Sequence, residues 1–190
     1  VVIAYRDEGN SGYGTAVVGT VSGTSISFGS EAVFESASTL YIGSTFDSGS
    51  NKVVVTYRDG GNSNYGTAVV GTVSGTSISF GSYATFDATT AESIAATFDP
   101  STNKVIISWQ SNGSDGKSAV GTISGTSISF GSPTTFSSGT AFYISSTYDS
   151  SNSKLVIAYG GPSNYATAIV GTVSGTSISF GTPVVFHSVE

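Results

Sequence analysis

Short apolar runs alternate with clusters of Gly, Ser, Asn and Asp along the whole chain. One stretch contains four such runs, which we call segments a, b, c and d: 41–46 (YIGSTF), 52–57 (KVVVTY), 67–73 (TAVVGTV) and 77–86 (SISFGSYATF). All four are rich in Val, Ile, Thr and aromatic residues, as strands are. No window has the apolar stripe with a period of about 3.6 residues that predicts a helix. The pattern therefore predicts an all-β protein.

Residues that favour tight turns join these segments. Segment c reaches segment d through Ser74-Gly75, where the glycine can adopt a positive φ. Segment a reaches segment b through a turn that opens with Asp47, and the copies of this turn open with Asp99 and Asp149. Asp side chains close such turns by accepting hydrogen bonds from nearby backbone. The predicted unit is therefore a four-stranded antiparallel meander.

One phrase recurs at a nearly fixed period. GTVSGTSISF starts at Gly19, Gly71 and Gly171, GTISGTSISF starts at Gly121, and the steps are 52, 50 and 50 residues. Such a period predicts stacked or radial copies of one supersecondary unit. The sequence thus predicts a single repeat domain over 1–190, with units at 1–38 (partial), 39–90, 91–140 and 141–190.

Segment b is apolar at consecutive positions, as in Val53, Val54 and Val55, which is typical of a strand buried on both faces. Sheets packed face to face around an axis bury both faces in this way. The pattern favours a β-propeller with four-stranded blades, and a β-solenoid is the alternative. The strand and hairpin pattern, as in TFDPSTNKVIISW, resembles kelch-like and tachylectin-like propellers. No specific family signature accompanies it, so the resemblance implies architecture alone.

The first copy lacks segment a, because Val1–Tyr5 matches segment b. The chain therefore predicts strands in the order bcd, abcd, abcd, abcd. Three explanations stay open: a window of a longer array, a four-bladed ring with an incomplete blade, or a homo-oligomer in which several chains complete one ring.

Charge narrows the choice of partner. The chain carries a net charge of −6, and only 9% of its residues are charged. Nucleic acids and anionic lipids are bound by basic stripes, so neither is expected as a partner. No apolar run approaches the length of about 18 residues of a membrane span, so no membrane insertion is expected. The Ser/Thr/Gly/Asn-rich surface and the absence of Cys favour an extracellular, cell-surface or virion setting.

The b–c loops differ between the copies, whereas the a–b and c–d turns hardly change. A constant scaffold with varied loops at one edge is a common way to build a binding site. Arg and Asp bind hydroxyls or carboxylates, Asn donates and accepts, and Tyr adds a flat apolar face, a mixture that suits a sugar. The predicted ligand-binding residues are Arg6, Asp7, Asn10, Tyr13, Arg58, Asp59, Asn62, Tyr65, Asn112, Lys117, Asn164 and Tyr165. The alternative is that Arg and Asp pair with neighbouring blades.

Other residues fit structural roles better. Lys52, Lys104 and Lys154 follow the a–b turns, where a solvated pair with the turn Asp is expected. Trp109 replaces the tyrosine of other copies and is expected in the core. Glu35 and Asp87 supply no consistent acid pair for glycosidase chemistry, and the single His187 allows no triad or histidine metal site. No catalytic residue, metal or cofactor is therefore predicted.

These patterns are compatible with three functions. The first is a non-catalytic, lectin-like or receptor-binding module that recognises carbohydrate or a surface glycoconjugate through its b–c loops. The second is a structural, self-assembling repeat module of a secreted, cell-surface or phage-tail protein. The third is part of a propeller-fold glycosidase or sialidase, which would need arginines beyond Arg6 and Arg58.

Overall fold

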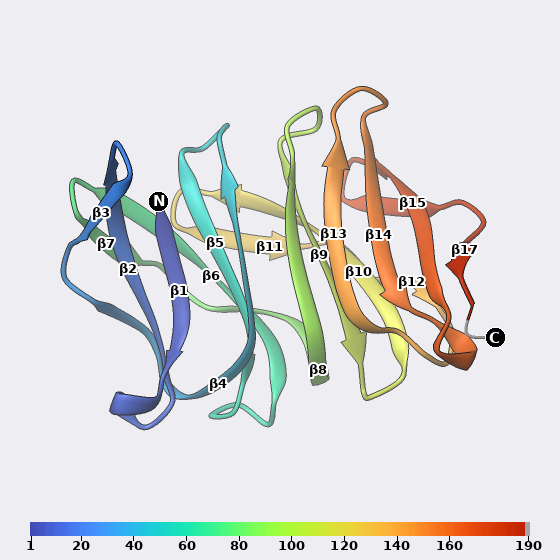
Figure 1. Cartoon of the computed structure of the whole chain (residues 1–190), viewed down its shortest axis with the longest axis horizontal. Coiled ribbons are helices and arrows are strands. Elements are labelled where there is room, and N and C mark those ends of the chain that lie inside the picture. Colours follow the sequence, from blue (N-terminus) through green and yellow to red (C-terminus); the bar gives the residue numbers. More distant parts are fainter. Residues whose placement is uncertain (189–190) are drawn as a thin grey trace.

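The computed structural model describes residues 1–188, almost entirely as antiparallel strands (Figure 1). The strands are β1 (Val2–Asp7), β2 (Tyr13–Ser22), β3 (Ser25–Phe28), β4 (Ala32–Asp47), β5 (Lys52–Asp59), β6 (Tyr65–Ser74), β7 (Ser77–Phe80), β8 (Ala84–Asp99), β9 (Lys104–Ser111), β10 (Asp115–Ser124), β11 (Ser127–Phe130), β12 (Thr134–Ser137), β13 (Phe142–Asp149), β14 (Lys154–Gly160), β15 (Ala166–Ser174), β16 (Ser177–Phe180) and β17 (Val184–His187). Two short 3₁₀ turns, η1 (Glu8–Asn10) and η2 (Pro162–Asn164), lie in loops. The all-β prediction is confirmed.

Strand pairing divides the chain into sets that we call blades. Blade 1 comprises β1, β2, β3 and the first half of β4, up to Ser38. Blade 2 runs from Thr39 through β5, β6 and β7 to Thr90 in β8. Blade 3 comprises the rest of β8 with β9 to β12, and blade 4 comprises β13 to β17. The predicted repeat units stay a prediction, and Val189 and Glu190 of the last unit lie outside the described residues.

Segment d is not one strand as predicted. In blade 2 it divides into β7, which pairs with the end of β6, and the start of β8, which pairs with the beginning of β6. The chain leaves the sheet between them at Gly81, because the backbone of the next blade occupies that space: a Cβ on Gly81 would overlap the carbonyl oxygen of Thr126. The two-residue turn before β7 is also shifted by one position, to Gly75-Thr76, with φ +61° at the glycine.

Segment a is longer than the sequence indicated. It forms the second half of the 16-residue strands β4 and β8, which leave the outer edge of one blade and become the innermost strand of the next. A bulge interrupts each of these strands, between Leu40 and Gly43 in β4 and between Glu92 and Ala95 in β8. A bulge bends a strand and turns side chains to a new direction.

The a–b turns form as the sequence predicts. The Asp47 carboxylate accepts hydrogen bonds from the Gly49 and Ser50 amides, and Asp99 accepts from those of Ser101 and Thr102. The lysines that follow do not pair with the turn Asp. Instead, Lys52 and Lys104 donate to the hydroxyls of Thr72 and Thr122 at 2.9 Å, because segment c lies beside them.

Three cores lie between consecutive blades, and segment b contributes to two of them. Val53 and Val55 face blade 1, whereas Val54 faces blade 3. The prediction that this strand is buried on both faces is therefore confirmed. The innermost strands β1, β4, β8 and β13 lie against one another in that order, and β13 is not packed against β1 in the same way within residues 1–188.

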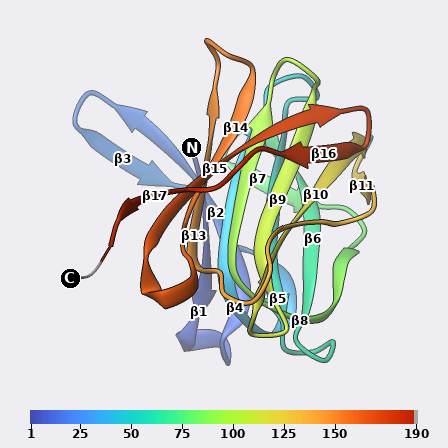
Figure 2. The same cartoon turned by 90° about the vertical axis from the view of Figure 1, so that its right-hand side faces the viewer.

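Two contacts recur between blades. In the first contact, a glycine that follows each outer hairpin lies against the turn threonine of the following blade. The pairs are Gly29–Thr76, Gly81–Thr126 and Gly131–Thr176. In addition, an aromatic ring at the end of each outer strand packs on the next blade, with Phe34–Phe80, Phe86–Phe130 and Phe136–Phe180 centroids 5.6, 5.9 and 5.7 Å apart. Figure 2 shows the outer hairpins extending in different directions, with the tip of the β2–β3 hairpin on the left and that of the β15–β16 hairpin on the right.

Candidate functional site

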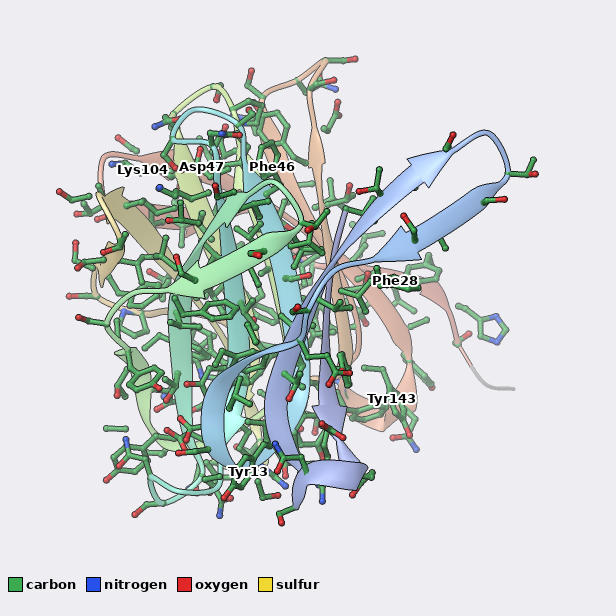
Figure 3. All side chains as sticks on the ribbon, turned by 90° about the vertical axis from the view of Figure 1, so that its left-hand side faces the viewer. Tyr13, Phe28, Phe46, Asp47, Lys104 and Tyr143 are labelled. Atoms are coloured by element: carbon green, nitrogen blue, oxygen red, sulfur yellow. The ribbon has the colours of Figure 1, made fainter. Side chains whose placement is uncertain are left out.

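The strands end at two different edges. The turn edge carries the a–b turns at 47–51, 99–103 and 149–153, and the loop edge carries the b–c loops at 8–12, 60–64, 112–114 and 161–165. Figure 3 places Asp47 and Lys104 at the upper, turn edge and Tyr13 at the opposite end of the molecule. The predicted ligand-binding residues all lie on or next to the loop edge.

Arg58 is the centre of the best-defined cluster at this edge. It lies near the end of β5, and its Nη1 donates to Oε1 of Glu92 on β8 at 2.7 Å. Its guanidinium carbon lies 4.8 Å from the centroid of the Tyr41 ring on β4. The side chains of Arg58 and Glu92 are 17% and 28% exposed, so the pair is held in place while polar atoms still reach solvent. Nε of Arg58 is buried and has no hydrogen-bond partner among the described residues.

The bulges of the innermost strands place a second set of side chains at this edge. Tyr41, Ser93 and Tyr143 adopt φ of 51°, 48° and 51°, a left-handed conformation that is unusual for a bulky residue. Such strain persists where the surrounding structure enforces it and is concentrated at functional sites. The backbone amide of Tyr143 donates to Oγ of Ser93 at 3.2 Å, so the bulges of blades 3 and 4 are joined. Tyr143 is 84% exposed.

An open hollow of about 500 Å³ lies between these bulges. It is lined by isoleucines, aromatic rings and polar side chains, which come from blades 2, 3 and 4. The lining residues are Tyr41, Ile42, Glu92, Ser93, Ile94, Gln110, Phe142, Tyr143 and Ile144. A hollow with aromatic surfaces and a few fixed polar groups suits a small polar ligand with an apolar face.

Some of the predicted residues are defined by contacts or backbone conformation within their own loops. The buried carboxylate of Asp59 accepts hydrogen bonds from the amides of Gly61 and Asn62, which closes its own loop. Asp7 precedes η1 and its side chain does not cap that turn. Asn112 and Asn164 occupy loop positions with φ of 52° and 61°. Their role in ligand binding stays a prediction.

The remaining predicted residues lie apart from the Arg58 cluster. Arg6 approaches Glu8 of its own loop, with Nε 2.8 Å from Oε1. Lys117 donates to Oγ of Ser111 at 3.1 Å. Asn10 and Asn62 are exposed. Three tyrosines are half-buried: Tyr13 and Tyr65 begin β2 and β6, and Tyr165 directly precedes β15. None of the twelve predicted residues lines the hollow itself, but Arg58 contacts two residues that do, Tyr41 and Glu92.

Sequence reasoning missed Tyr41, Glu92, Gln110 and Tyr143. Tyr41 and Tyr143 lie at the start of segment a, Glu92 lies directly before it, and Gln110 lies directly after segment b at the position of Arg58. A signal was present, because the aligned positions Leu40, Glu92 and Phe142 differ strongly between otherwise similar strands. Variation directly before segment a therefore marks the same edge as variation in the b–c loops.

Glu35 and Asp87, the acids considered for catalysis, accept hydrogen bonds from aromatic residues of the cores beneath this edge. Oδ2 of Asp87 accepts from Nε1 of the fully buried Trp109 at 2.5 Å, and Oε2 of Glu35 accepts from the Tyr57 hydroxyl at 3.2 Å. Burial raises the pKa of Glu35 and the charge of Asp59 raises it further, whereas the hydrogen bond from Tyr57 acts in the opposite direction. The expectation that Trp109 belongs to the core is confirmed.

No group of three or more His, Asp or Glu side chains within residues 1–188 is arranged to hold a metal ion. In the same part of the chain, no helix is long and apolar enough to cross a membrane.

Comparison with solved structures establishes the fold class as a β-propeller. The chain is similar to a single-site mutant of Aleuria aurantia lectin, a β-propeller lectin, in complex with Fucα1-6GlcNAc and, in a second structure, with α-methyl-L-fucoside. Each match has a TM-score of 0.61 and 17% sequence identity, and covers 94% of this chain and 55% of the lectin chain. The chain thus spans about half the length of the structures it matches. No family model and no curated protein matches the sequence.

Proposed function

We propose that this chain is a non-catalytic carbohydrate-binding module and that the sugar binds at the hollow beside Arg58. The observation that carries this proposal is the cluster in which Arg58 lies between the Tyr41 ring and the Glu92 carboxylate at the rim of an open hollow. The lectin with which the chain shares its fold is bound to fucosides in both solved structures.

The chemistry of the rim fits a sugar. An Arg–carboxylate pair offers donors and acceptors at fixed positions, which match neighbouring hydroxyl groups. The rings of Tyr41 and Tyr143 offer flat surfaces to the apolar face of a pyranose. Since the pair is already formed, little side-chain ordering is needed on binding, and pre-organised groups give higher affinity. The finer resemblance to kelch-like and tachylectin-like propellers stays a prediction, as does an extracellular, cell-surface or virion setting.

Catalysis is not part of the proposal. A glycosidase needs two carboxyl groups that face one substrate. Glu35 and Asp87 each accept a hydrogen bond from a buried aromatic residue, and Glu92 is paired with Arg58. These acids therefore support the scaffold and the rim.

A glycan array that includes fucosylated glycans tests the proposal. Arg58→Ala should reduce retention on the array at least about tenfold, because the lost charge-assisted contacts exceed about 1.4 kcal/mol. Arg6→Ala is the matched control, since Arg6 occupies the same position in blade 1 but approaches Glu8 of its own loop. Equal retention by wild type and Arg58→Ala would place any sugar site elsewhere.

A further inference from the structure

We propose that the two end faces of this chain bind each other head to tail, so that blade 4 of one copy packs against blade 1 of a second copy. Each blade has a front face, which packs on the preceding blade, and a rear face, which packs on the following blade. The front of blade 1 and the rear of blade 4 are the two faces that no blade covers in the single chain. This inference does not depend on the proposed sugar site.

The front face of blade 1 exposes apolar residues that are buried in every other blade. Ile26 of β3 is 44% exposed, whereas its counterparts Ile78, Ile128 and Ile178 are 7%, 6% and 4% exposed. Ile3 of β1 is 42% exposed, whereas Val55, Ile107 and Ile157 are fully buried. Phe28 is 53% exposed as well, and Figure 3 shows it at the base of the β2–β3 hairpin.

The rear face of blade 4 shows the same contrast. Phe186 of β17 is 64% exposed, whereas its counterparts Phe34, Phe86 and Phe136 are 1%, 5% and 7% exposed. Val170 of β15 is 46% exposed, whereas Val18, Val70 and Val120 are 5%, 0% and 1% exposed. Grouped apolar side chains of this kind mark interaction surfaces.

The two faces are complementary, because they are the two halves of an interface that already forms three times inside the chain. Phe34 contacts Phe80 and Tyr57 across the first internal interface. By the same geometry, Phe186 of one copy meets Phe28 and Tyr5 of the next.

The smaller contacts match too. In the contact between two copies, Thr24 is the counterpart of Thr76 and Gly181 is the counterpart of Gly29. The space beside Gly181 is open in the described part of the single chain, because only a distant Val170 oxygen lies near it. Tyr5 then faces His187, as Tyr57 faces Glu35.

The occupant of each end face is therefore a second copy of this chain in the opposite role, and not the same face of another copy. The front face needs a glycine and an outer-strand phenylalanine opposite it, and only a rear face supplies them. Such a contact is heterologous, and it continues until a ring closes or a filament grows.

Light scattering of the purified 190-residue chain over a range of concentrations is the first test. We expect a mass that exceeds 19.1 kDa and rises with concentration to a multiple of it. A mass of 19.1 kDa at every concentration up to about 1 mM, where even weak contacts of about 4 kcal/mol form, would overturn the proposal.

Two variants then test the pairing of the faces. Phe28→Glu disables the front face and Phe186→Glu disables the rear face. Both substitutions introduce the same charge, because the two residues face each other across the proposed contact. Both residues are exposed in the single chain, so folding should persist. Each variant alone should weaken association by at least about a hundredfold, as loss of a central aromatic anchor does. The control is Val33→Glu, which lies on the front side of blade 1 at a position where Thr85 and Thr135 stay exposed in covered blades.

Mixing gives the decisive result. The Phe28→Glu protein keeps an intact rear face and the Phe186→Glu protein keeps an intact front face, so an equimolar mixture should form a 1:1 dimer although each alone is monomeric. The two substituted faces carry like charges, so the dimer should not grow further. If either variant alone stays oligomeric at wild-type concentration, or if the mixture stays monomeric while the wild type assembles, the head-to-tail contact is refuted.

Discussion

The turn edge and the loop edge of the same strands differ in how closely their residues are repeated from blade to blade. At the turn edge, Asp47, Asp99 and Asp149 each accept hydrogen bonds from the backbone two and three residues ahead, in the same way in blades 2, 3 and 4. At the loop edge, Arg58 is replaced by Gln110 and Gly160 in the following blades. The backbone nevertheless keeps the same bulge at Tyr41, Ser93 and Tyr143. The scaffold is therefore constant at both edges, and only the loop edge changes its chemistry.

The largest expected effect comes from the core directly below the loop edge. Trp109→Ala should lower the free energy of unfolding by about 3–5 kcal/mol, because it leaves a large cavity. It also removes the contact with Phe86, at a centroid distance of 4.8 Å, and the only side-chain donor that the Asp87 Oδ2 atom has among the described residues. Urea denaturation measures the change. Trp109→Tyr, which introduces the residue of Tyr57 and Tyr159, should be less destabilising; equal losses would contradict a core role for the aromatic ring.

The next effect separates the two edges. Asp99→Ala at the turn edge should destabilise the fold by about 1–3 kcal/mol, since the amides and hydroxyls of Ser101 and Thr102 lose their acceptor. Ser114→Ala at the loop edge is the control and should change stability by less than about 0.5 kcal/mol. Thermal unfolding of both variants measures the difference. A loop-edge variant that is as damaging as the turn-edge variant would remove the contrast between the edges.

Measuring Tm over a range of pH tests how much the charged turn carboxylates stabilise the fold. Burial alone would raise the pKa of Asp99, but hydrogen bonds from Thr102 and Ser101 together lower it below its ordinary value of 3.8. A lowered folded pKa supplies stability that is present above pH 3.8 and is lost as the pH falls through the folded pKa. The Tm difference between wild type and Asp99→Asn should thus be full at about pH 7 and shrink below about pH 4. A difference that is constant down to about pH 2 would exclude this role.

The smallest effect on stability belongs to a change that adds a site. Leu40 occupies in blade 2 the position of Glu92 in blade 3, and Arg6 occupies in blade 1 the position of Arg58 in blade 2. Leu40→Glu should change stability by less than about 1 kcal/mol, because the residue is half-exposed. If the Arg–Glu pair is sufficient for a site, calorimetric titration with α-methyl-L-fucoside should count one more site per chain, although blade 1 lacks segment a and so has no counterpart of Tyr41. An unchanged number of sites would show that the Arg–Glu pair alone does not make a site.

Local sequence was sufficient for the strands and the turns but not for the site. Val53, Val54 and Val55 showed a strand buried on both faces, and Asp47 showed its turn, because both signals act over a few residues. The division of segment d at Gly81 depends on Thr126 of the next blade, which no local pattern contains. In the same way Arg58 was recognised from its loop, but its partner Glu92 lies 34 residues ahead in another blade. Comparison of aligned positions across the repeats is what reveals such partners.

The glycine–threonine contact between blades also bears on how such a chain can lengthen. Gly29, Gly81 and Gly131 accept Thr76, Thr126 and Thr176 in the same way, so any blade fits any neighbour. A gene duplication that adds one period of 50 codons therefore inserts a blade whose two sides already match the flanking ones. No new interface has to evolve for the protein to grow, and unequal crossing-over between the near-identical phrases supplies the event. Selection is then left to act on the loop edge of each new copy.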